Sequence, residues 1–154
     1  MNKDLNRKVL VNVPNFYVKD EDFDENSKAP IDILIAESIE ILNKKGYKTK
    51  FCCSGHLEVD GTTDEWISFD VPGREQIIKE MNENIRKFGT HAYVTFDDFY
   101  ENLPYLYGWI LDNSGKVENC GSSIYCHIKN PTYRKLKRIH SRFRNWCKKL
   151  PKLN

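Results

Sequence analysis

The sequence predicts an α+β fold in which three helices accompany a single mixed or antiparallel sheet of about six strands. Segments with the spacing of strands and of helices do not alternate strictly along the chain, which argues against a parallel βαβ arrangement. A length of 154 residues with a hydrophobic content of 40% suffices for one domain with its own core. We therefore expect residues 1–154 to form a single domain.

The N-terminal part of the chain predicts one strand, one loop and one helix. Residues 8–13 alternate valine with other side chains, as a strand with one β-branched face does. Residues 15–29 are rich in Asp and Glu and show no period, which indicates an acidic surface loop. Pro30 favours the first turn of a helix, and the apolar positions of residues 31–42 recur at helical spacing before Gly46, which suits a helix C-terminus.

The rest of the chain supplies the other predicted elements. Alternating positions indicate strands, and apolar residues at helical spacing indicate helices. In chain order, these elements are a strand at 47–53, a strand at 66–71, a helix at 74–88, a strand at 91–97, a hairpin that joins 105–111 to a segment ending near 128, and a helix at about 131–149. The run Asp112-Asn113-Ser114-Gly115 supplies the turn chemistry that the hairpin needs.

The C-terminal helix is strongly basic, although the net charge of the chain is only +2. Nine Lys and Arg residues follow Pro131, and no Asp or Glu does. Its apolar positions follow helical spacing, so we expect an amphipathic helix packed on the sheet. The basic face could bind nucleic acid or a phosphorylated ligand, because the guanidinium forks of Arg134 and Arg138 fit phosphate geometry. It could equally lie against the acidic surface of its own domain.

Composition excludes several classes of protein. No apolar run approaches the roughly 20 residues that a membrane helix needs. The N-terminal residues lack the apolar segment of a secretory signal peptide, and five cysteines, an odd number, do not suggest a disulfide framework. We expect a cytoplasmic protein with reduced thiols and no membrane partner.

The run Cys53-Ser54-Gly55-His56, which follows a predicted strand, is the candidate ligand-binding site. Gly55 permits a sharp turn, and backbone N–H groups in such a turn can face an anion. The structural alternative is that Gly55 serves a bend and Cys53 is a small core residue. Trp109 belongs to an aromatic stretch that could line a pocket for a planar base, or it could lie in the core.

The same residues allow two chemical interpretations. His56 could activate Cys53 as a nucleophile, provided that the two side chains face each other. Cys53 and His56 could instead bind zinc together with Cys120, Cys126 or His127, but the paired Cys-x-x-Cys pattern of a zinc ribbon is missing. We therefore expect no metal, and we assign no catalytic residue.

Part of the chain, at about residues 33–57, has the pattern of an amphipathic helix, a turn and then the run ending Cys53-Ser54-Gly55. This pattern resembles the N-terminal part of the wybutosine-synthesis tRNA methyltransferase family, whose motif ends Cys-Ser-Gly-Arg. His56 replaces the arginine here, and Cys52 replaces a serine. The resemblance implies a related α+β fold in which the loop lies in a pocket for S-adenosylmethionine or a nucleotide. The chain also resembles small uncharacterised bacterial and phage proteins with a Cys-Ser-Gly-His loop.

These features lead us to expect a small phage-type or mobile-element-type binding protein. It would capture a nucleotide-like anionic ligand between the Ser54-Gly55-His56 loop and the C-terminal arginines, without a cofactor, and could sequester a host-defence nucleotide signal. One alternative is an RNA methyltransferase-like protein that uses S-adenosylmethionine, and another is an inhibitor that binds a protein. Nucleic acid, bound through the basic helix, and a second copy of the chain are compatible partners, and whether the protein is an enzyme stays open.

Overall fold

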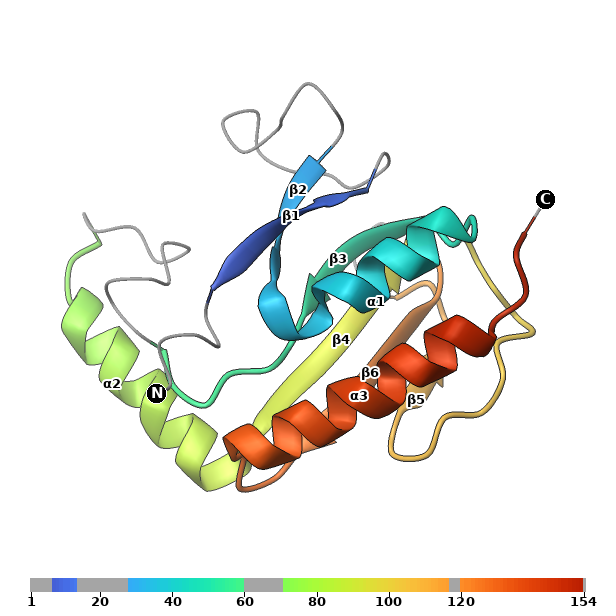
Figure 1. Ribbon diagram of the computed structural model, residues 1–154. Helices are drawn as coiled ribbons and strands as arrows, with labels where there is room; N and C mark the ends of the chain where they lie inside the picture. Colours follow the sequence, from blue (N-terminus) through green and yellow to red (C-terminus); the bar gives the residue numbers. More distant parts are fainter. Residues whose placement is uncertain (1–6, 14–27, 60–70, 117–119, 154) are drawn as a thin grey trace.

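The computed structural model describes residues 7–13, 28–59, 71–116 and 120–153 (Figure 1). The helices are α1 (Ile33–Lys44), α2 (Arg74–Phe88) and α3 (Tyr133–Lys149). The strands are β1 (Lys8–Asn12), β2 (Lys28–Asp32), β3 (Thr49–Cys53), β4 (Thr90–Phe96), β5 (Ile110–Asp112) and β6 (Ser123–Ile128). The predicted α+β class is confirmed, and so is the basic C-terminal helix.

The strands form two antiparallel sheets, so the prediction of a single sheet is wrong. Strands β1 and β2 pair with each other, and the larger sheet has the order β3-β4-β6-β5. Strand β2 ends at Asp32 and α1 starts at Ile33 without an intervening loop. This direct connection keeps the two-stranded sheet beside α1 (Figure 1), and β2 contacts β3, an edge strand of the larger sheet, without pairing with it.

The predicted helical position of Pro30 is also wrong. Pro30 lies in β2, opposite Leu10 of β1. Proline is tolerated on the edge of a two-stranded ladder, where its missing N–H costs no hydrogen bond. Of the predicted acidic loop at 15–29, the last two residues belong to β2 and the others lie outside the described residues. The predicted strand at 66–71 also falls outside them, except for Val71, which lies in a bend.

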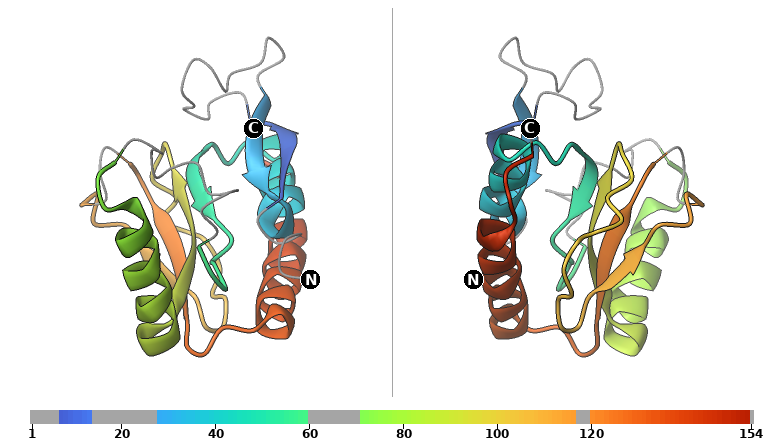
Figure 2. Two further views of the ribbon diagram at one scale, coloured as in Figure 1. Left: turned by 90° about the vertical axis from the view of Figure 1, so that its left-hand side faces the viewer. Right: turned by 90° about the vertical axis from the view of Figure 1, so that its right-hand side faces the viewer.

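Helices α1 and α3 lie together on one face of the four-stranded sheet (Figure 2). The side chain of Thr132 caps α3 by accepting a hydrogen bond from the Lys135 N–H. Leu136, Phe143 and Trp146 then recur at helical spacing and are buried in the core. The apolar stripe of the sequence therefore faces inward, and the basic residues face outward.

Helix α2 lies on the other side of the sheet (Figure 2). None of its residues is fully buried, and its apolar positions, Ile77, Ile78, Met81 and Ile85, are half-buried. Its bounds agree with the predicted helix at 74–88. Asn82 ties it to the segment that follows β3, because its side chain exchanges hydrogen bonds with the N–H and the carbonyl of Val59. Among the helices in the described part of the chain, none is long and apolar enough to cross a membrane.

Candidate functional site

The loop that follows β3 is anchored at Ser54. This residue is buried, and its N–H and hydroxyl both donate to the same carboxylate oxygen of Asp32, at 3.1 and 3.2 Å. Asp32 is the N-cap residue of α1, yet its carboxylate makes no capping bond with its own helix. Its Oδ1 atom lies 3.9 Å from the ammonium of Lys8, so β1, α1 and the loop meet at this carboxylate.

The same residue is held from the other side by α3. His140 Nε2 donates to the Ser54 carbonyl at 2.7 Å, and the His140 side chain is buried. Burial lowers the pKa of His140, and the bond to Ser54 opposes this shift only in part. We infer a neutral imidazole with its proton on Nε2. Its Nδ1 atom makes no hydrogen bond with the described residues.

The remaining backbone donors of the loop also have partners inside the chain. The Gly55 N–H donates to Cys53 Sγ at 3.4 Å, and the His56 N–H donates to Thr90 Oγ1 at 2.9 Å. Gly55 has a φ of +86°, and a side chain there would press on Thr90 and Leu136. In this conformation the N–H groups of the loop are therefore not available to an anion, and the loop acts as a junction between β3, β4, α1 and α3.

Cys53 and His56 face each other across this turn. Their Sγ and Nδ1 atoms are 3.6 Å apart, and both residues are half-buried. An imidazole at this distance can accept or donate the thiol proton, which is the arrangement that a cysteine nucleophile requires. Tyr93 stands opposite Cys53 on β4, and burial, followed by the two neighbouring thiols, raises its pKa to about 12.

The thiols of Cys52, Cys126 and Cys147 have raised pKa values. Burial raises the pKa of Cys52 well above its usual range, raises that of Cys126, and raises that of Cys147 to about 12. No cysteine of the described segments forms a disulfide. Nowhere in those segments do three or more His, Cys, Asp or Glu side chains gather as metal ligands would.

The other predicted site residues lie apart from the loop. Arg134 and Arg138 are exposed on α3, each two positions before a residue that faces the loop, Leu136 or His140. Because an α-helix has 3.6 residues per turn, two positions carry a side chain to the opposite face. Trp109 is buried and stacks on Phe143 with ring centroids 4.6 Å apart. The structure thus does not bring these three residues together with Ser54, Gly55 and His56.

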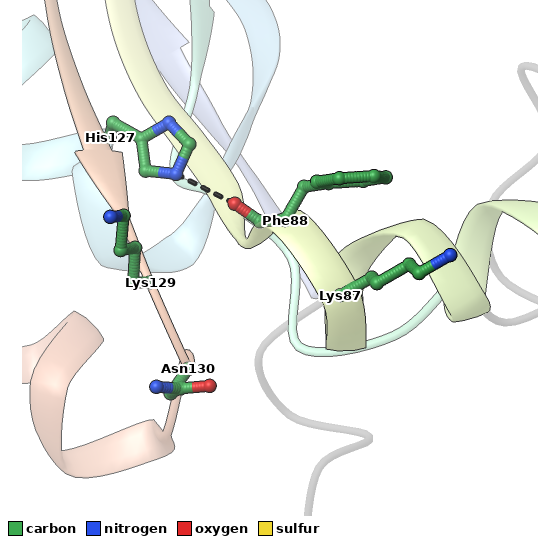
Figure 3. A pocket seen from close by; sticks show the side chains of 5 residues that line it. All are labelled: Lys87, Phe88, His127, Lys129 and Asn130. Carbon is green, nitrogen blue, oxygen red and sulfur yellow. Dashed lines mark hydrogen bonds between the residues drawn. The ribbon is translucent and has the colours of Figure 1, made fainter.

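A hollow of about 370 Å³ lies instead where α2 ends and β6 leads into α3 (Figure 3). It is lined by Lys87, Phe88, His127, Lys129 and Asn130. Figure 3 shows the Lys87 and Phe88 side chains extending to one side, with His127 and Lys129 on the other. The Phe88 side chain is 62% exposed. Exposed side chains change rotamer within nanoseconds, so Lys87 and Phe88 can turn toward a ligand at little cost.

Two unusual backbone positions shape the hollow. Gly89 has a φ of +91°, and a Cβ atom there would overlap the carbonyl oxygen of Ile128, so only glycine lets the end of α2 approach the end of β6 this closely. Asn130 has a φ of +47°, a conformation that asparagine tolerates better than most residues, and it turns the chain from β6 toward α3. Lys135 Nζ donates to the carbonyls of Lys129 and Asn130, both at 3.0 Å, which stabilises this turn.

His127, which lines the hollow, is held in place by two hydrogen bonds, one of them to a second histidine, His91. His127 Nε2 lies 2.7 Å from the Phe88 carbonyl, and His127 Nδ1 lies 3.0 Å from His91 Nε2. Since a carbonyl only accepts, His127 carries its proton on Nε2, and its Nδ1 accepts from His91. Burial, and then the proximity of His127, lowers the pKa of His91. The His127 ring is therefore fixed in one orientation.

The sequence did not single out this hollow. The residues that line it come from two segments about 40 positions apart in the sequence. Taken alone, each segment has the pattern of an ordinary helix end or strand end. The exposed aromatic residue in the last turn of α2 is the one local signal. The chain matches no family model, and comparisons with curated proteins and with solved structures gave no match either.

Proposed function

We propose that this protein binds a nucleotide-like anionic ligand in the hollow between Lys87 and Lys129. The observation that carries the proposal is the combination, around one cavity, of two exposed lysines and an exposed phenylalanine ring. Lysine is a common phosphate ligand, and an aromatic ring offers a surface on which a base can stack. A volume of about 370 Å³ lies near the lower end of the range of ligand pockets, which favours a single nucleotide over a larger ligand.

The charge around the hollow supports an anionic ligand. The ammonium of Lys135 is bonded to the carbonyls of two lining residues, so a third positive charge stands beside the cavity. Arg134 and Arg138 belong to the first two turns of α3, at the same end of the fold. An adjoining depression is lined by Glu83, Arg86 and Lys87, so one carboxylate stands there beside two cations. The balance is therefore positive.

The same charge bears on S-adenosylmethionine, the cofactor of the methyltransferase alternative. Its sulfonium and ammonium groups outweigh its single carboxylate, and it carries no phosphate. A cavity lined by lysines is a poor match for such a cation. Phosphorylated nucleotides match the positive charge of the cavity better than S-adenosylmethionine does. We therefore place a nucleotide-binding protein ahead of a methyltransferase.

Calorimetric titration tests the proposal. Adenosine monophosphate, a cyclic nucleotide, adenosine diphosphate ribose and S-adenosylmethionine are titrated into the purified protein. We expect binding of at least one phosphorylated ligand and a roughly five- to thirty-fold loss in the Lys129→Ala and Phe88→Ala variants, which corresponds to about 1–2 kcal/mol per contact. Lys149→Ala removes the same charge from the far end of α3 and should leave affinity unchanged. Absence of binding at millimolar concentration, or an equal loss in the Lys149 variant, would contradict the proposal.

A further inference from the structure

The four-stranded sheet has a second face, opposite the one that α1 and α3 cover. The register pairs Tyr93 with Tyr125 and His91 with His127 across β4 and β6. Side chains alternate along a strand, so these four rings share one face of the two central strands. The intervening residues, Ala92 and Cys126, are buried on the core face.

This row of rings is partly accessible to solvent. Tyr93 is 37% exposed, Tyr125 is half-buried, and both histidines are exposed. Phe51 of β3 and Ile110 of β5 continue the same face on either side and are 37% and 55% exposed. Helix α2 lies on this side of the sheet (Figure 2), and none of its residues is completely buried.

The row of rings leads directly into the hollow. His127 belongs to both, and Lys129 follows it by two positions, just past the end of β6 in the direction of α3. Successive residues on one face of a strand are about 7 Å apart, so Tyr125 lies about 7 Å from His127 along the strand, on the side away from Lys129. Cations therefore gather at one end of the face, and aromatic rings extend from them across the two central strands.

We propose that this face binds a single-stranded nucleic acid, with one nucleotide in the hollow and the adjacent bases stacked on Tyr93 and Tyr125. The inference rests on the proposed function, because the hollow supplies the first nucleotide site. Unpaired bases stack well on aromatic side chains displayed on an open antiparallel sheet, and lysines at the end of the sheet complement the charge of the phosphates. A protein partner fits less well, since among the described residues of this face the exposed apolar side chains are Phe51 and Ile110, beside tyrosines and histidines.

Fluorescence anisotropy with labelled single-stranded hexanucleotides of RNA and of DNA tests the inference, with adenosine monophosphate as competitor. We expect the hexanucleotides to bind at least about tenfold more tightly than the mononucleotide. Tyr125→Leu should weaken hexanucleotide binding by about 5- to 150-fold, the factor expected for loss of one stacked base, and leave mononucleotide affinity unchanged. Tyr125→Phe retains the ring and should retain binding. Tyr107→Leu changes an exposed tyrosine outside the sheet and serves as the matched control.

The outcomes separate the two proposals. A hexanucleotide that binds no more tightly than adenosine monophosphate, or a Tyr125→Leu variant that stays folded in urea titrations and binds normally, overturns the stacking surface and leaves the nucleotide site standing. Equal affinity for a duplex of the same sequence also overturns it, because paired bases cannot stack on the rings. Absence of binding by both the mononucleotide and the hexanucleotides removes both proposals.

Discussion

The imidazole of His127 donates a hydrogen bond of 2.7 Å to the carbonyl of Phe88, which joins the end of β6 to the end of α2. This contact holds the end of α2, with the exposed Phe88, against the end of β6, so that Phe88 and Lys129 line the same hollow, and it depends on the close approach that Gly89 permits. The geometry of the hollow therefore depends on a few residues at one end of the sheet.

The close approach of Gly89 to β6 predicts that alanine at Gly89 lowers the free energy of unfolding more than alanine at Gly73 does. Gly73→Ala should cost about 1–2 kcal/mol in the free energy of unfolding, since its φ is +73° and no atom of the described residues lies within 4 Å of an added Cβ. Gly89→Ala should cost roughly 2–5 kcal/mol, because the new Cβ also overlaps the Ile128 carbonyl. Urea denaturation of both variants measures the difference. Equal losses would show that the contact between α2 and β6 is looser than described.

The bond between His140 and Ser54 predicts a loss of stability when the donor is removed. His140→Leu leaves the buried Ser54 carbonyl without its partner and should lower the free energy of unfolding by about 1–3 kcal/mol. His140→Gln keeps an N–H donor and should lose less. Urea denaturation compares the two variants, and an equal loss in both would mean that the packing of the ring, and not its hydrogen bond, stabilises the junction.

The lowered pKa values of His140 and His91 predict that acid weakens the fold. Both groups bind a proton more weakly in the folded chain than at their ordinary value of 6.5, so the unfolded chain takes up more protons. The free energy of unfolding should therefore fall as the pH drops below 6.5. Above that pH the contribution of the two neutral histidines to stability should be complete. Chemical denaturation across this range should give a shallower pH dependence in His140→Gln. An unchanged slope would exclude His140 as a source of the effect.

The environments of the thiols predict selective alkylation. Iodoacetamide at neutral pH should modify Cys53 at least about tenfold faster than any other described cysteine, because Cys53 is only half-buried and contacts His56. Burial raises the pKa values of Cys52, Cys126 and Cys147, which keeps them as thiols. Mass spectrometry of tryptic peptides gives the rates, with Cys53→Ser as control. Faster modification of Cys147 would contradict the described packing.

Local patterns predicted much of the fold. The regular apolar spacing of α2 and α3 and the alternation of β3 and β4 identified these elements within a few residues of their bounds. The prediction for Pro30 was wrong. Proline favours the first turn of a helix, but here Pro30 pairs with Leu10 in a two-stranded ladder. The division into two sheets depends on which strands pair, and pairing is a long-range property that spacing does not encode.

The candidate site was harder to predict than the fold. The Cys53-Ser54-Gly55-His56 run was recognisable as special, but its N–H groups bond to Cys53, Asp32 and Thr90, and that geometry appears only when β4 and α1 are in place. The hollow was missed because Phe88 and Lys129 become neighbours through the fold alone. Sequence spacing can locate a sharp turn, whereas a cavity between chain segments requires the tertiary structure.

The most direct test of the central claim is a titration of the isotope-labelled protein with adenosine monophosphate, followed by backbone amide chemical shifts. Binding in the hollow predicts the largest shifts at Lys87, Phe88, Gly89, Lys129 and Asn130, with smaller changes at the distant end of α3. Shifts concentrated at Ser54, Gly55 and His56, or no shifts at millimolar ligand, would contradict the claim.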